Sequence, residues 1–74
     1  MRLDYYLETD TLYIELRDGP GADAREVARD IVLDLNETGE GVGIEIDHAS
    51  ERADLNMLQL SSFPAQIPRA AAST

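Results

Sequence analysis

The chain has 74 residues, no cysteine, and 15 acidic against six basic side chains, which gives a formal net charge of −9. Such a length allows one domain with a thin core, and the absence of cysteine excludes disulfides and cysteine-based zinc sites as its support. The negative charge would be repelled by phosphate backbones and anionic lipids, so we expect neither direct nucleic-acid binding nor membrane docking.

Apolar residues at every second position predict a first hairpin within residues 3–16. The alternating apolar residues are Leu3, Tyr5, Leu7, Leu12, Ile14 and Leu16. A register that pairs Leu7 with Leu12 keeps all six on one face, closed by a Thr9-Asp10 turn or by a four-residue loop of residues 8–11. The same register predicts a cross-strand aromatic pair between Tyr6 and Tyr13 on the opposite face.

The next segment contains a clear loop signal and then an ambiguous stretch. Asp18-Gly19-Pro20-Gly21 predicts a loop, and residues 22–30 follow it. Apolar residues in that stretch fit a helical stripe with Asp23 as a cap. The alternation of Arg25-Glu26-Val27, followed by a β-branched run, favours an edge strand with a bend or bulge near residues 28–30. We predict the strand and keep the helix as the alternative.

A second hairpin is predicted over residues 31–46. Pairing Leu35 with Val42, and Ile31 with Ile46, keeps the apolar residues of both strands on one face. This register places Thr38-Gly39 at the tip, where Gly39 supplies a positive φ, and it places Gly43 opposite Asp34 on the polar side.

Alternation stops after the second hairpin, and the charge pattern changes with it. Residues 50–53 fit a single helical turn. Residues 1–54 carry all 15 acids and five arginines, a net charge of −10, whereas Arg69 is the single charge of residues 55–74. The apolar residues of this tail are Leu55, Met57, Leu58, Leu60, Phe63 and Ile67. We expect such a tail to pack on the sheet or on a partner subunit.

The predicted fold class is therefore mainly β, a β-rich α+β fold. It consists of an antiparallel meander of two hairpins with an edge strand, a short C-terminal helical turn and an extended tail. Residues 1–54 form the acidic β-meander domain, and residues 55–74 form the apolar tail. Residues 1–4 lack the apolar run of a secretory signal, and no stretch is long enough to span a membrane, so we expect a cytoplasmic protein.

Candidate functional residues lie on the predicted polar face and in the tail. Asp34 and Glu45, with His48, are candidate ligands for a hard divalent cation, although strand carboxylates also serve simply as solvated gatekeepers against aggregation. No nucleophile set accompanies the single histidine, so we expect no catalytic residues and no cofactor. The candidate interface residues are Tyr6, Tyr13, Leu58, Leu60 and Phe63.

Four short patterns, taken in order, resemble the domain of unknown function 2283 family over residues 3–50. They are Asp10-Thr11-Leu12-Tyr13-Ile14, Val32-Leu33-Asp34-Leu35, Gly43-Ile44-Glu45-Ile46 and His48-Ala49-Ser50. The chain departs from the family pattern at Asn36 and at Asp47-His48. The resemblance implies a small bacterial or archaeal protein whose biochemistry is unassigned. Some members are similar to partners of small RelE-like toxins that are encoded beside them.

The sequence thus predicts a non-enzymatic acidic protein that acts as a homodimer or higher homo-oligomer, or as the antitoxin-like partner of a basic protein such as a small toxin. The alternative is a small metal-dependent enzyme or metal-binding protein that uses the carboxylate face around Asp34 and Glu45.

Overall fold

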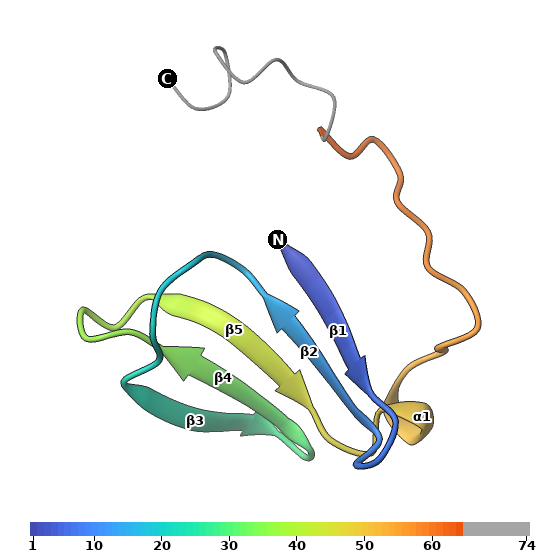
Figure 1. The fold of residues 1–74 in the computed structure, drawn as a ribbon, viewed down its shortest axis with the longest axis horizontal. Helices are drawn as coiled ribbons and strands as arrows, with labels where there is room; N and C mark the ends of the chain where they lie inside the picture. Colours follow the sequence, from blue (N-terminus) through green and yellow to red (C-terminus); the bar gives the residue numbers. More distant parts are fainter. Residues whose placement is uncertain (65–74) are drawn as a thin grey trace.

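The computed structural model describes residues 1–64, which form one open antiparallel sheet and one short helix (Figure 1). The elements are β1 (Arg2–Tyr6), β2 (Thr11–Glu15), β3 (Asp23–Ala28), β4 (Ile31–Leu35), β5 (Gly41–Ile46) and α1 (Ala49–Arg52). The fold is mainly β, as the alternating apolar pattern predicted. No helix among these residues is long and apolar enough to cross a membrane.

The strand order is β1-β2-β5-β4-β3, so the first hairpin pairs with the last strand in the chain. Residues 16–22 carry the chain from β2 past β5 and β4 to the far edge of the sheet (Figure 1). The connection ends where the Ala22 amide donates to the Leu35 carbonyl at 2.7 Å. The two predicted hairpins are both present, and they join through β2 and β5.

The first hairpin has the predicted faces but a different register. Leu3 pairs with Ile14 and Tyr5 with Leu12, a shift of two residues from the predicted pairing. A shift of two leaves every side chain on its predicted face, because the side-chain period of a strand is two. The predicted Tyr6–Tyr13 pair was wrong, since Tyr6 lies opposite Thr11.

The hairpin turn makes a tertiary contact that a tight two-residue turn was not expected to make. Residues 7–10 form the loop, in which Asp10 is left-handed with φ 54°, and Leu7 is 81% exposed instead of pairing with Leu12. The Asp10 carbonyl accepts a hydrogen bond of 2.8 Å from the Ala49 amide at the start of α1. Asp10 therefore binds the first residue of α1 and does not form part of a tight two-residue turn.

The second hairpin follows the predicted register except at the end next to its turn. Ile31 pairs with Ile46, and Asp34 pairs with Gly43. A bulge places Leu35 opposite Gly41 instead of the predicted Val42. The tip holds Gly39 at φ 85°, as predicted for this turn.

The ambiguous segment is a strand, and the predicted turn after β5 is helical. β3 forms one edge of the sheet and pairs with β4, with a register shift between Glu26 and Ala28. α1 covers the position expected for a single helical turn. The helix alternative for residues 22–30 is therefore wrong.

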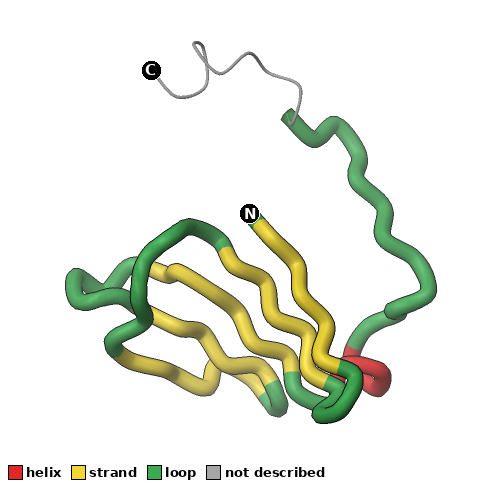
Figure 2. Tube along the Cα trace, in the orientation of Figure 1, coloured by secondary structure: helices red, strands yellow, loops and turns green. Residues whose placement is uncertain are grey.

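The described part of the chain has very little core. Leu35, Val42 and Ala49 are its only buried hydrophobic residues. Residues 55–64, called the arm below, leave α1 as an extended segment and do not lie over the sheet in this view (Figure 2). Residues 65–74, including the predicted apolar position Ile67, lie outside the described residues.

Candidate functional site

One side of the sheet, called the acidic face below, collects the polar strand residues. Tyr13 pairs with Glu45, and Glu15 pairs with Gly43, which in turn pairs with Asp34. Arg2, at the edge of this face, lies 2.9 Å from Asp4 and 3.5 Å from Glu15. The predicted polar positions Asp34 and Glu45 therefore do share a face.

Tyr13 lies directly over Gly43 on the acidic face. A Cβ at Gly43 would overlap the Tyr13 hydroxyl and lie only 2.5 Å from the ring carbon Cζ. Burial raises the pKa of Tyr13, and a hydrogen bond with Asp34 raises it further. Gly43 is thus needed for the close approach of an aromatic ring rather than for a special backbone angle.

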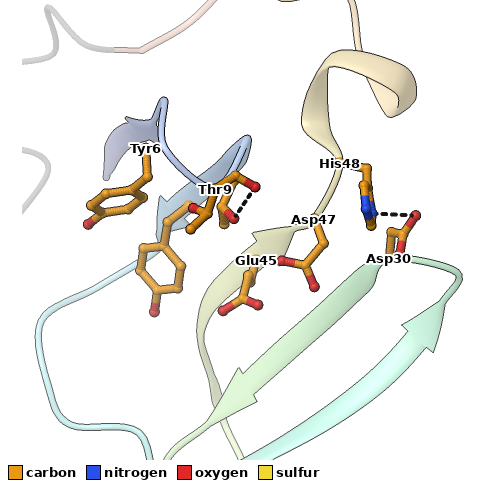
Figure 3. A pocket seen from close by; sticks show the side chains of 8 residues that line it. Tyr6, Thr9, Asp30, Glu45, Asp47 and His48 are labelled. Carbon is orange, nitrogen blue, oxygen red and sulfur yellow. Dashed lines mark hydrogen bonds and ion pairs between the residues drawn. The ribbon is translucent and has the colours of Figure 1, made fainter.

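A shallow hollow of about 700 Å³ lies on the acidic face (Figure 3). Its lining comes from β1, β2, β5 and the turns at one end of the sheet: Tyr6, Thr9, Thr11, Tyr13, Asp30, Glu45, Asp47 and His48. Figure 3 shows the carboxylates of Glu45 and Asp47 side by side, two residues apart at the end of β5. The hollow therefore combines aromatic rings with carboxylates, a chemistry that suits cationic groups.

Crowding of negative charge is greatest at Glu45. Burial raises the pKa of this carboxyl most, and the neighbouring Asp47 and Asp34 raise it further. A positively charged group placed in the hollow would relieve this repulsion. A bound cation or a proton at Glu45 would therefore relieve the cost of its buried charge.

Asp30 has a structural role at the end of the hollow. Its Oδ2 lies 2.9 Å from Arg52 Nε, 2.8 Å from Arg52 Nη2 and 3.4 Å from His48 Nδ1. These contacts, with the Arg52 hydrogen bond first, lower the pKa of Asp30. His48 therefore shares its carboxylate partner, Asp30, with Arg52 of α1.

Asp10, in the turn between β1 and β2, also contacts the residues of α1. Its carboxylate accepts hydrogen bonds from Ser50 Oγ at 2.6 Å, from the Ser50 amide at 3.1 Å and from Tyr5 Oη at 2.7 Å. These bonds, with that of Ser50 Oγ first, lower the pKa of Asp10, and the Asp10 contact raises the pKa of Tyr5. Asp10 thereby caps α1 from a distant turn.

Sequence reasoning missed these two aspartates as a pair. Asp10 and Asp30 both adopt positive φ, at 54° and 63°, and each closes a strand connection that faces α1. Aspartate is enriched among left-handed residues, so an aspartate directly before each strand was the available signal. Asp10 binds α1 from the β1–β2 turn, and Asp30 binds it from the β3–β4 turn.

The three candidate metal ligands do not converge. Glu45 and His48 line the hollow, whereas Asp34 does not line it and pairs with Gly43 on the neighbouring strand. Within residues 1–64, no three side chains of the ligand types are arranged to hold a metal ion. The metal alternative stays a prediction, which calorimetry with calcium, magnesium and manganese would test.

The other side of the sheet, called the apolar face below, carries large aliphatic residues and Tyr5. They are Leu3, Tyr5, Leu12, Ile14, Ile31, Leu33, Leu35, Val42, Ile44 and Ile46. Leu3 is 42% exposed and Tyr5 is 43% exposed. An apolar groove of about 560 Å³ runs between this face and the first residues of the arm. Among the described residues, this face has no second layer over it.

The predicted interface residues separate into two groups. Tyr6 and Tyr13 lie in the hollow of the acidic face. Leu58, Leu60 and Phe63 lie on the arm, where they are exposed. These residues therefore do not form one continuous surface in a single copy.

The fold and its two faces define a small single-layer antiparallel β-sheet protein whose turns are held by a helical turn. The chain belongs to the family described as "Protein of unknown function (DUF2283)", whose pattern matches residues 2–50. The match covers the sheet and the start of α1, and it ends before the arm. Comparison with curated proteins found no match, and comparison with solved structures found none.

Proposed function

We propose that this chain is a non-enzymatic protein-interaction domain that assembles with copies of itself through its apolar face. The observation that carries the proposal is the uncovered apolar face of a single-layer sheet. A sheet with one hydrophobic face must bury it against another layer, and in residues 1–64 only three hydrophobic residues are buried.

The free energy of burying apolar side chains favours assembly over a free monomer. Full burial of a large aliphatic side chain contributes about 1.5 to 3 kcal/mol, so covering several half-exposed residues contributes a large share of the stability of a small domain. Leu3 and Tyr5 on the edge strand are the most exposed of this face. A second layer would therefore stabilise the fold and define its oligomeric state together.

Light scattering at micromolar concentration tests the proposal. We expect a mass at least twice the chain mass of 8.2 kDa. Leu3→Thr should weaken this association, whereas Tyr6→Thr should not, because the two residues lie on opposite faces of β1 with similar exposures of 42% and 52%. A wild-type monomer with a cooperative melt would refute the proposal.

A second candidate function is binding of a basic protein by the acidic face, as an antitoxin-like role requires. The observation that favours it is the hollow, which brings two tyrosine rings to the carboxylates of Glu45 and Asp47. Arginine side chains suit such a surface, since they pair with carboxylates and stack on aromatic rings.

An arginine-rich peptide is the probe for this second function. We expect calorimetry to show binding that weakens in Glu45→Gln/Asp47→Asn and remains in Asp18→Asn/Glu37→Gln, which removes the same charge outside the hollow. Added salt should weaken peptide binding by screening. It should strengthen self-association, because it screens repulsion between copies of charge −9. Equal binding by both double variants would argue against the hollow.

A further inference from the structure

We infer that the arm, residues 55–64, covers the apolar groove of a second copy, so that two copies exchange arms in a symmetric dimer. The inference rests on the proposed function, because it names the contact through which the copies assemble. Its basis is the path of the arm, the surface that the arm exposes and the charge of the two segments.

The arm leaves its own sheet. It begins at α1, beside the edge strand β1, and extends away from the strands (Figures 1 and 2). Its large apolar side chains are exposed to 39–70%: Leu55, Met57, Leu58, Leu60 and Phe63. A run of exposed apolar residues marks an interaction surface, and Leu60 and Phe63 do not line the groove of their own copy, so this part of the arm needs a surface from elsewhere.

The apolar groove provides a matching surface. The sheet lines it with Leu3, Leu12 and Ile14, and the start of the arm lines it with Leu55 and Met57. The remaining arm residues, beyond Leu58, do not line the groove. The groove residues Leu3 and Tyr5, which are 42% and 43% exposed, can therefore accept an extended apolar segment from another chain.

The charge of the two segments favours the arm of a second copy as the segment that fills the groove. Residues 1–54 hold 15 acids and five arginines, a net charge of −10, whereas the arm contains no ionisable side chain. A basic partner would gain nothing electrostatically from the arm, and two acidic sheets would repel each other. An uncharged arm can enter the groove of another copy without burying a charge.

A second copy also supplies both halves of the contact. Each copy carries one arm and one groove, so a two-fold arrangement pairs each arm with a groove and leaves neither open. A single extra protein would have to replace both surfaces at once. The self-complementary arrangement is therefore the simplest one that covers the arm and the apolar face together.

Disulfide trapping tests the exchange, because the chain has no cysteine of its own. Leu3→Cys and Leu60→Cys are combined in one chain, which is oxidised and run on a non-reducing gel. We expect a covalent dimer. A disulfide within one chain, at monomer mass, would show that the arm folds over its own sheet and would overturn the inference.

Two controls identify the contact. Tyr6→Cys/Leu60→Cys places the sheet cysteine on the opposite face of β1, and we expect far less covalent dimer from it. Mixing a tagged Leu3→Cys chain with an untagged Leu60→Cys chain should give a product of intermediate mass, which neither chain gives alone. Equal yields of covalent dimer from the Leu3→Cys and Tyr6→Cys double variants would contradict a specific binding site for the arm.

A matched pair of charge substitutions separates this inference from the proposed function. Leu60→Asp should raise the dimer dissociation constant by at least about tenfold, whereas Gln59→Asp, which adds the same charge one residue earlier, should change it by less than about threefold. A dimer unaffected by Leu60→Asp would leave the assembly standing and overturn arm exchange. A wild-type monomer would overturn both.

Discussion

The two faces of the sheet are made by the same strands, yet they expose different chemistry to solvent. On the acidic face, Tyr13 fills the space over Gly43. On the apolar face, Leu3 and Tyr5 stay more than 40% exposed. Polar groups can be satisfied by neighbours or by water, whereas an apolar surface needs another layer. The difference supports the apolar face as the surface for the proposed self-association.

The largest expected effect comes from shortening one side chain on each face to alanine. Ile44→Ala removes a half-buried side chain from the middle of the apolar face, and we expect it to cost about 2 kcal/mol of unfolding free energy and to weaken self-association. Val32→Ala, on the acidic face of the adjacent strand, should cost less than about 1 kcal/mol and leave association unchanged. Urea unfolding and light scattering measure both. Similar losses of association would contradict the contrast between the faces.

The second comparison adds one methyl group to each face. Gly43→Ala forces the Tyr13 ring off its seat, and we expect a cost of about 1 to 3 kcal/mol. Gly41→Ala is the control on the apolar side, where the new Cβ would lie 3.4 Å from Leu33 Cδ1 and 3.7 Å from Leu16 Cδ1. That variant should change stability by less than about 0.5 kcal/mol. The Tyr13 ring resonances in NMR spectra should shift only in Gly43→Ala.

The smallest expected effect is a response to acid that separates two kinds of carboxylate. Glu45 has a raised pKa in the folded chain, so lowering the pH from 7 through that pKa protonates the folded state first and stabilises it. Asp10 and Asp30 have lowered pKa values, so their contribution is present above the ordinary value of 3.8 and is lost as the pH falls through their folded pKa values.

The melting temperature should therefore rise slightly from pH 7 to about the ordinary glutamate pKa of 4.5 and fall below about 3.8. Glu45→Gln should remove the rise and keep the fall, because it leaves both aspartates in place. Asp10→Asn should lower the melting temperature at neutral pH and reduce the acid-induced fall. A rise that persists in Glu45→Gln would assign it to other acids.

Local alternation determined which residues share a face and where the strands lie. Leu12 and Ile14, or Asp34 and Glu45, could be assigned to their faces because the side-chain period of a strand does not depend on its partner. For the same reason a register error of two residues in the first hairpin left both faces correct. The acidic composition of the strands and the lack of charge in the arm follow directly from the amino-acid sequence.

Only the tertiary structure decided which strands meet and what the turns do. The pairing of β2 with β5 joins segments about 30 residues apart, and an alternating strand offers the same edge to any partner. Asp10 and Asp30 acquire their roles only once α1 lies between the two turns, since Ser50 and Arg52 are distant in sequence from both. Long-range contacts of this kind leave no periodic trace in the chain, because they depend on how whole elements pack and not on local spacing.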